Sequence, residues 1–264
     1  MKLSEQNKRM IWKANQRKRD SYERTVARMF KSALNKQVRQ AMGVFNKHTS
    51  PLDKLDDALR MIEPELLLKP LKYTYKTVGS AFARASYKEV GTPKKEDKNF
   101  EQLMEQWLIQ HGGEEITLIT ATTKKEFEKI VRRTMADAAN SGLSVDNAAK
   151  LLRKRAMEEM GKSNFYRAQR IARTEIVRAS NHGSLEGVRA TGLAVDKIWL
   201  STRDSRTRDT HYDMDGVRVD KDAEFIVGGI DHMDSPGMGS VASENINCRC
   251  TLIYDRKEIQ NVGI

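Results

Sequence analysis

A chain of 264 residues is long enough for one large domain or two smaller domains with a buried core. Its 39% apolar and 31% charged residues are typical of a soluble, helix-rich protein with a large solvated surface. No apolar run approaches the roughly 20 residues of a membrane span, and no apolar stretch follows the basic start as it would in a signal peptide. Two cysteines are too few for a disulfide framework, so we expect synthesis in a reducing cytoplasm.

The net charge of +11 is concentrated at the N-terminus. Residues 1–47 hold 13 Lys and Arg against 3 Asp and Glu, whereas the other 217 residues hold 34 against 33. We therefore expect this segment to contact nucleic acid phosphates or an acidic protein surface. The alternative is a long solvated helix whose charge bias has no partner. The candidate binding residues are the basic residues Lys8, Arg9, Lys13, Arg17, Lys18, Arg19, Arg24, Arg28 and Lys31.

Residues 5–45 are expected to form one long helix. Apolar residues recur there at three- and four-residue steps, with basic residues on the other faces. The apolar stripe is narrow, so it needs a partner in this chain or in another protein. Its members are Tyr22, Val26, Phe30, Ala33 or Leu34, Val38, Ala41 and Phe45.

Prolines and glycines divide the next region, residues 48–114. Ser50-Pro51 predicts a helix start, and Glu63-Pro64 predicts a second one. Pro70 is expected to kink or end that second helix. A helical stripe of Tyr75, Val78, Phe82 and Ala85 then continues to about residue 89. The charged turn at 91–98 is the best candidate for a boundary or a mobile loop.

The following helices are predicted from their stop and start signals. One helix begins near Phe100 and is expected to end at Gly112-Gly113. Residues 116–123 are β-branched and suit a short strand, although Thr123, three residues before Glu126, also resembles a helix cap. That cap would open a helix to about residue 140, ended by Gly142. A short helix is expected after Ser144, and a long one from Ser163 to near Gly192.

After Gly192 the apolar period changes from that of a helix to that of short strands. Strand-like pieces at 197–200, 216–219, 225–227 and 251–254 are separated by turn residues. The fold class we expect is α+β and predominantly α-helical, with a helical body and a small C-terminal cap of short antiparallel strands. The chain would divide into a basic N-terminal helix (1–47), a helical region (48–114) and a C-terminal domain (115–264).

The strongest candidate for chemistry is Cys248-Arg249-Cys250 together with His211. Alternate residues of a strand face the same side, so both thiolates could bind one metal ion. Tetrahedral Zn²⁺ takes four N or S ligands, or three with a carboxylate or water. His211 is the first choice for the third ligand, and His232, Asp213 or Asp231 for the fourth. The alternative is that both cysteines are small buried hydrophobes beside a hydrogen-bonded histidine.

A second hypothesis for the same region is a hydrolytic metal site, as in a metal-dependent nuclease. It would use the histidines and aspartates His211, Asp213, Asp215, His232 and Asp234. The alternative is turn chemistry, with Asp215 preceding a glycine and with Asp204 and Ser205 capping local backbone.

Other polar residues have candidate structural roles. Arg173 and Glu175 lie in a helical stretch and leave it on different sides. We expect each to tie the helix to a cap loop, with Arg203, Asp204, Arg206 and Arg208 as candidate partners. A solvated helix surface explains the spacing equally well. Gly183 and Gly187, four residues apart, would allow another segment to approach closely. The sequence has no P-loop, no dinucleotide-binding glycine motif and no nucleophile elbow.

Several motifs occur in a distinctive order: RIARTEIVRASNHG, then a tryptophan followed by DSRTRDTH and MDG, then FIVGG, SPG and INCRCTLIY. In this order they resemble the Mu F-like phage head morphogenesis (minor capsid) protein family over roughly residues 115–254. Residues 1–114 carry no such signature. One departure is Pro236-Gly237-Met238, where the family often has Pro-Gly-Asp.

The resemblance implies a structural protein of a tailed phage or prophage, present in few copies inside the capsid at the portal vertex and in the host cytoplasm during assembly. Its implied partners are the portal protein, other capsid or scaffolding proteins, and double-stranded DNA, with no membrane contact. The resemblance implies no enzymatic activity. Some relatives carry a C-terminal toxin domain, which we do not expect here because 10 residues follow Tyr254.

Overall fold

The computed structural model describes residues 4–46, 48–91 and 99–257. The chain forms two compact units, each assembled from segments that lie far apart in the sequence. Unit 1 contains the described parts of Met1–Arg24, Tyr73–Gln106 and Arg170–Ile264. Unit 2 contains those of Thr25–Lys72 and Trp107–Gln169. The sequence division at residues 47 and 114 stays a prediction.

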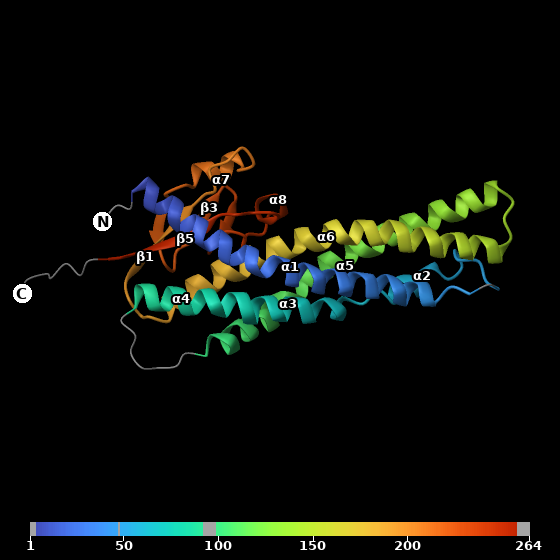
Figure 1. The fold of residues 1–264 in the computed structure, drawn as a ribbon, viewed down its shortest axis with the longest axis horizontal. Coiled ribbons are helices and arrows are strands. Elements are labelled where there is room, and N and C mark those ends of the chain that lie inside the picture. Colours follow the sequence, from blue (N-terminus) through green and yellow to red (C-terminus); the bar gives the residue numbers. More distant parts are fainter. Residues whose placement is uncertain (1–3, 47, 92–98, 258–264) are drawn as a thin grey trace, which may run out of the picture. The chain divides into compact units, whose positions relative to one another are not determined.

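Three long helices supply most of the residues of both units (Figure 1). They are α1 (Glu5–Gly43), α5 (Phe100–Asn140) and α6 (Val145–Arg189). Shorter helical segments lie between α1 and α5: α2 (Leu55–Arg60), the 3₁₀ turn η1 (Pro64–Leu67), α3 (Leu68–Thr74), the π-turn η2 (Tyr75–Gly79) and α4 (Ser80–Val90). The predicted loop at 91–98 lies outside the described residues except for Gly91.

All the described strands belong to unit 1 and follow α6. An antiparallel sheet has the order β2–β1–β5, with β1 (Val195–Leu200) between β2 (Arg218–Asp220) and β5 (Thr251–Arg256). A separate hairpin pairs β3 (Phe225–Val227) with β4 (Asp231–Met233). Two short helices, α7 (Asp209–Asp213) and α8 (Ala242–Asn245), lie beside these strands (Figure 1).

The sheet of unit 1 is covered on both faces, which explains why β1 is buried along almost its whole length. One face packs around Trp199, together with the apolar residues of the β3–β4 hairpin and of α6. The other face places Ile198 and Leu200 against Ile11 and Trp12 of α1. The start of the basic helix is therefore part of the fold of the C-terminal cap.

Unit 2 is a helical bundle with a core of its own. Apolar residues of α1, α2, α5 and α6 form one buried cluster. Phe45 and Phe127 stack in it, with ring centroids 6.2 Å apart and an interplanar angle of 16°. The predicted stripe from Val26 to Phe45 is buried there, so its partner lies within this chain.

The predicted break at Gly112-Gly113 is wrong, and so is the strand at 116–123. Residues 100–140 form the single helix α5. A glycine costs a helix about 1 kcal/mol relative to alanine, which the burial of Leu108, Ile116 and other residues of the same helix outweighs. Thr123 is not a cap, because its hydroxyl donates to the Ile119 carbonyl one turn earlier at 3.1 Å.

Three further helix boundaries differ from the prediction. Ser163 lies inside α6 and donates its hydroxyl to Glu126 at 2.9 Å instead of opening a helix. Pro70 lies in the first turn of α3, where its missing N–H has no helical acceptor to lose. Ser50 accepts a hydrogen bond from the Leu52 amide, and a turn separates it from α2.

The π-turn changes which residues of α4 are buried. The period of 3.6 residues predicts that Ala85 faces inward, but Ala85 is exposed and Ser86 is buried. A π-turn inserts one extra residue into the helix and shifts the buried face accordingly. Ser86 then lies 2.6 Å from Ser184 of α6, between the two hydroxyl oxygens.

The predicted fold class is confirmed, and four of the five strands match predicted pieces to within two residues. Strand β4 was not predicted, because a run of three residues between turns has too little pattern to detect. Among the described residues, no helix is both long enough and apolar enough to cross a membrane.

Candidate metal centre

His211 is positioned by the short helix α7 and the turn that follows it. The His211 amide donates to the Arg208 carbonyl at 3.1 Å, and Asp215 accepts a hydrogen bond from the Ser201 amide at 2.8 Å. Gly216 donates to the Trp199 carbonyl at 2.8 Å, which returns the chain to β1. This turn holds His211 below the ring of Trp199, with ring centroids 5.4 Å apart and an interplanar angle of 82°.

The two cysteines meet His211 in the core of unit 1. Nδ1 of His211 lies 3.4 Å from Cys250 Sγ and 3.7 Å from Cys248 Sγ. The three ligand atoms all lie within 4.8 Å of one another, and the residues are only 1–2% exposed. Ligand atoms around a tetrahedral zinc, with bonds of about 2.1 to 2.3 Å, lie roughly 3.5 to 3.8 Å apart. The donor set and its spacing therefore fit Zn²⁺.

The second ring nitrogen of His211 faces a carboxylate. Nε2 lies 3.0 Å from Oε2 of Glu244 on α8. The hydroxyl of Thr210 donates to the same carboxylate oxygen at 2.8 Å. A carboxylate on the outer nitrogen of a histidine fixes the tautomer and turns the other nitrogen toward a metal. Nδ1 is thereby left as the nitrogen that faces the cysteines.

The environment makes the two thiols unequal. The pKa of Cys248 is held well below its usual value, because the Cys250 thiol donates a hydrogen bond to it and His211 acts in the same direction. The pKa of Cys250 is raised by the neighbouring Cys248 thiolate and by burial. One thiolate is therefore favoured at neutral pH, and a cation between both sulfurs would favour the second.

The predicted candidates for the fourth ligand do not join this group. Among the described residues, His211, Cys248 and Cys250 form the one cluster of metal-binding type. His232 is exposed and its Nδ1 lies 3.2 Å from Glu224. Asp213 is exposed on α7, and buried Asp231 accepts hydrogen bonds from the Ser240 and Val241 amides.

The geometry does not support the predicted hydrolytic site either. Such a site needs carboxylates that converge on one metal. Instead, Asp215 pairs with Arg203, and Asp234 pairs with Arg189 on α6. Each of these carboxylates has a structural partner, as turn chemistry suggests.

Arg173 and Glu175 bind neighbours other than those predicted. Arg173 Nε donates to Glu23 of α1 at 2.7 Å. Glu175 is buried and accepts from the Tyr75 hydroxyl at 3.4 Å. The predicted ties from these two residues to the cap loop are therefore wrong. The cap loop is closed by Asp204, which binds both terminal nitrogens of Arg249 at 2.5 and 2.7 Å.

The Asp204–Arg249 pair and Arg206 stabilise the loop before α7. Asp204 accepts a hydrogen bond from the Arg206 amide at 3.0 Å, while the Arg206 side chain stays exposed. The Arg249 guanidinium holds the pKa of Asp204 well below its usual range. The structural roles predicted for Asp204 and Asp215 agree with these contacts.

The basic residues of α1 divide into two groups. Arg9, Lys13 and Arg17 follow at four-residue steps and are exposed on one face, and Arg24 and Arg28 are also exposed. Lys8 and Lys31 are half-buried; Lys8 pairs with Glu5 at 2.9 Å, and Lys31 lies over the Phe165 ring at 5.1 Å. Lys18 is half-buried and donates to the Ala81 carbonyl at 3.0 Å.

Arg19 has a structural role that the sequence did not reveal. It is 2% exposed, and it donates to Ser180, Asn181, Thr251 and the Cys250 carbonyl. Burial lowers its pKa to about 10. Its donors are committed within unit 1, so the prediction that Arg19 contacts DNA or a portal is corrected.

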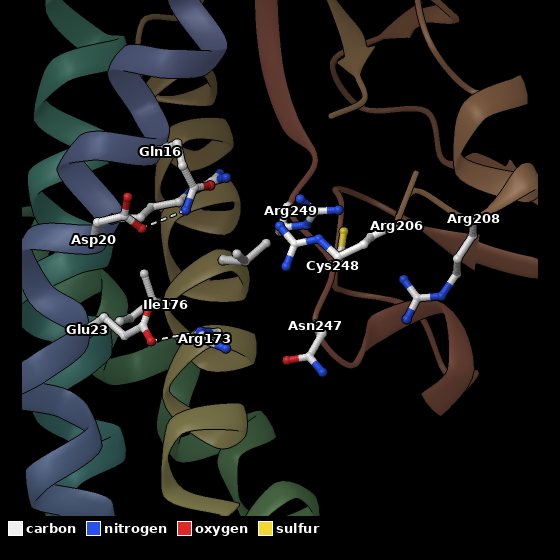
Figure 2. A pocket seen from close by; sticks show the side chains of 12 residues that line it. Gln16, Asp20, Glu23, Arg173, Ile176, Arg206, Arg208, Asn247, Cys248 and Arg249 are labelled. Atoms are coloured by element: carbon white, nitrogen blue, oxygen red, sulfur yellow. Dashed lines mark hydrogen bonds and ion pairs between the residues drawn. The ribbon is translucent and has the colours of Figure 1, made fainter. Parts of the chain in front are cut away.

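A cleft of about 500 Å³ lies beside the candidate metal centre in unit 1 (Figure 2). We call it the arginine cleft. One wall consists of α1 and α6, and the other consists of the loops around residues 206–208 and 247–249. Five arginines and two carboxylates line it: Arg19, Arg173, Arg206, Arg208, Arg249, Asp20 and Glu23. Cys248 also lines it.

Comparison with known proteins connects these elements to one family. Residues 129–253 match the model of the family described as Phage Mu protein F like protein. This region is a member of that family. It contains the metal-ligand candidates, the cap loop and the α6 residues that bind the cap, so the Mu F-like region coincides with the cluster described above.

Two curated relatives show where the similarity lies. The minor head protein GP7 of Bacillus phage SPP1 is 30% identical over 145 residues, which are 53% of this chain and 45% of that protein. The NAD(+)--arginine ADP-ribosyltransferase EFV of Enterococcus faecalis is 40% identical over 102 residues, which are 38% of this chain and 21% of that protein. The chain thus spans less than half the length of both relatives. No solved structure matches.

The Mu F-like motifs meet one another in the structure. Asn181 and Arg178 of the α6 motif donate to the carbonyls of Pro236 and Gly237 at 2.9 and 2.8 Å. Asn181 also donates to the Cys250 carbonyl at 3.0 Å. Met238, in place of the aspartate often found there, packs against the cap core. This motif order therefore reflects one set of contacts between α6 and the cap.

Proposed function

We propose that this protein is a minor head protein that acts in phage head assembly, docked on the portal inside the capsid and present in the host cytoplasm during assembly. The Mu F-like match of residues 129–253 is the observation that carries this proposal. The similarity to the SPP1 minor head protein supports it independently. The activity named for the ADP-ribosyltransferase is not proposed here, because the similarity covers 21% of that protein.

The exposed basic face of α1, formed by Arg9, Lys13 and Arg17, is the proposed contact for packaged DNA or for an acidic portal surface. The three side chains share one helix face, and the opposite face, with Trp12 and Arg19, is bound into unit 1. A helix that is anchored on one side and basic on the other can hold phosphates without refolding.

The test is a triple variant, Arg9→Gln, Lys13→Gln and Arg17→Gln, compared with Lys125→Gln, Lys129→Gln and Lys154→Gln. Both sets remove three exposed positive charges from helices, but the second lies in unit 2. Binding to double-stranded DNA is measured over a range of salt concentrations, together with capture by the purified portal protein of the same phage. Deleting residues 1–45 would be a poor test, because Arg19, Val26 and Phe30 are buried.

We expect the α1 variant to weaken DNA binding and to reduce its salt slope by up to about 2.7, roughly 0.9 for each phosphate contact. We expect the same variant to reduce portal capture if the portal surface is acidic. Equal behaviour of the two variants in both assays would refute the assignment to α1. Failure of the unsubstituted chain to bind portal or to enter heads would refute the function itself.

The candidate metal centre is proposed to be a structural Zn²⁺ site held by His211, Cys248 and Cys250. Buried sulfur and nitrogen atoms at tetrahedral spacing, with a carboxylate behind the histidine, support this proposal. A bound zinc would supply a cross-link between α7 and the turn before β5. Because the nearby aspartates are committed elsewhere, no described contact favours the alternative of a nuclease or hydrolase.

A further inference from the structure

The arginine cleft contains more positive charge than the fold consumes. Of the five arginines that line it, Arg173 and Arg249 pair with Glu23 and Asp204. Arg19 is committed to buried acceptors in unit 1. Like charges that converge without an anion repel one another, so such a cluster stabilises the fold only when something neutralises it.

Two arginines retain donors that face the cleft. Arg208 donates one hydrogen bond, from Nη2 to the Ile246 carbonyl at 2.6 Å. Arg206 approaches Asp204 only to 3.8 Å, and its side chain is 77% exposed. Figure 2 shows Arg206 and Arg208 on the loop side of the cleft, opposite α1 and α6. Their remaining N–H groups are placed to bind a ligand.

The loop wall of the cleft is held before any ligand arrives. The Asn247 amide donates to the Thr174 hydroxyl at 3.1 Å, and Trp12 Nε1 donates to the Arg249 carbonyl at 3.1 Å. Asn247 has a φ of 59°, a left-handed conformation that is uncommon outside glycine and frequent at binding sites. A wall fixed in this way loses little conformational freedom when it binds a ligand.

The size and charge of the cleft indicate its ligand. About 500 Å³ suits a group of mononucleotide size and is too small for a DNA duplex. Arginine binds carboxylate and phosphate alike through paired N–H donors. A phosphate monoester carries nearly two charges and three acceptor oxygens, so it can satisfy two guanidiniums at once, whereas one carboxylate cannot.

We propose that the arginine cleft binds a phosphate group, with Arg206 and Arg208 as its principal ligands. The group could come from a free nucleotide or from the 5′ end of a nucleic acid strand. Asp20 on the opposite wall excludes ligands that place further negative charge there. This site shares no residue with the exposed basic face of α1, so the two proposals stand or fall separately.

The experiment measures binding to the full chain by calorimetry at fixed salt. The probes are pyrophosphate, adenosine monophosphate, and a short single strand with either a 5′-phosphate or a 5′-hydroxyl. The variants are Arg206→Gln, Arg208→Gln and their combination, with Arg218→Gln as the control. Arg218 is an exposed arginine of unit 1 that pairs with Asp196 and Asp255 and lies outside the cleft.

We expect each cleft variant to weaken phosphate binding about tenfold or more, the loss of one charge-assisted contact, and Arg218→Gln to change nothing. Asp20→Asn should strengthen binding a few-fold, which a purely structural role for the arginines would not produce. Tighter binding of the 5′-phosphate strand than of the 5′-hydroxyl strand assigns the terminal phosphate, whereas binding of the mononucleotide alone assigns a free nucleotide.

Three results would overturn the proposal. These are the absence of measurable binding to every probe, equal binding by the double variant with its circular dichroism unchanged, and tighter binding of a glutamate-rich peptide than of any phosphate. The last result would reassign the cleft to an acidic protein segment.

Discussion

At the residue scale, the two nitrogens of His211 have different neighbours. Nδ1 faces both cysteine sulfurs, and Nε2 faces Glu244 at 3.0 Å. The chain also offers a natural comparison, because His232 faces Glu224 at 3.2 Å on the surface. The same pair of residue types thus occurs once behind a candidate metal ligand and once without any thiol nearby.

Glu244→Gln should therefore weaken zinc binding roughly 10- to 100-fold, the usual cost of losing an outer partner of a metal ligand. Glu224→Gln should leave zinc affinity unchanged. The measurement is zinc content after purification, followed by competition with a chromogenic chelator. An equal effect of both substitutions, or the absence of stoichiometric zinc in the unsubstituted protein, would contradict the site.

His211, Cys248 and Cys250 were predictable because sulfur and imidazole at that spacing have few other uses in so polar a segment. Glu244 was not predictable, since a glutamate in a helix of four residues looks like any surface acid. The role of Arg19 was hidden for the opposite reason. It lies in a run of basic residues, and only its place on the same helix face as Trp12 and Asn15 indicates burial.

At the element scale, the existence of the helices followed from their apolar period, but their continuity did not. Local signals at Gly112, Ser163 and Pro70 are each worth about 1 kcal/mol or less in these settings, and burial of one apolar side chain is worth more. The division into two units was also beyond sequence reasoning. Contacts such as Arg19 with Asn181 join residues that lie far apart in the chain.

One element-level prediction from the sequence did succeed. Gly183 and Gly187 of α6 allow close approach of another segment, which proves to be η2 and α4. A Cβ at Gly183 would lie 2.1 Å from the Gly79 carbonyl oxygen, and one at Gly187 would lie 2.1 Å from that of Ala83. Both obstacles are backbone atoms, so they cannot rotate away.

Gly183→Ala and Gly187→Ala should each reduce the free energy of unfolding by roughly 2 to 4 kcal/mol, the range of severe overpacking. Gly161→Ala in the same helix meets nothing within 4 Å and should raise it by up to about 1 kcal/mol through helix propensity. Urea denaturation followed by circular dichroism measures all three. Similar behaviour of Gly183→Ala and Gly161→Ala would show that α6 and η2 do not approach this closely.

At the scale of the whole molecule, positive charge is used in two ways. Some of it is internal, as with Arg19 in unit 1 and Arg167 in unit 2, both of which are buried. The rest stays on helix surfaces or in the arginine cleft. Net charge alone therefore overstates the basic surface available to a partner.

The candidate metal centre belongs to unit 1 alone, so removal of zinc should act on the two units unequally. A metal that joins His211 to Cys248 and Cys250 closes a long loop and stabilises its folded form by about 4 kcal/mol when free zinc is a thousandfold above its dissociation constant. Hydrogen exchange before and after chelation should show faster exchange in peptides of β1, α7 and the turn before β5. Peptides from residues 125–140 and 145–165 of unit 2 should not change. A Cys248→Ser, Cys250→Ser variant should show no response to the chelator. Equal acceleration in both units, or no change around α7, would show that the cysteines and His211 stabilise the cap without a metal.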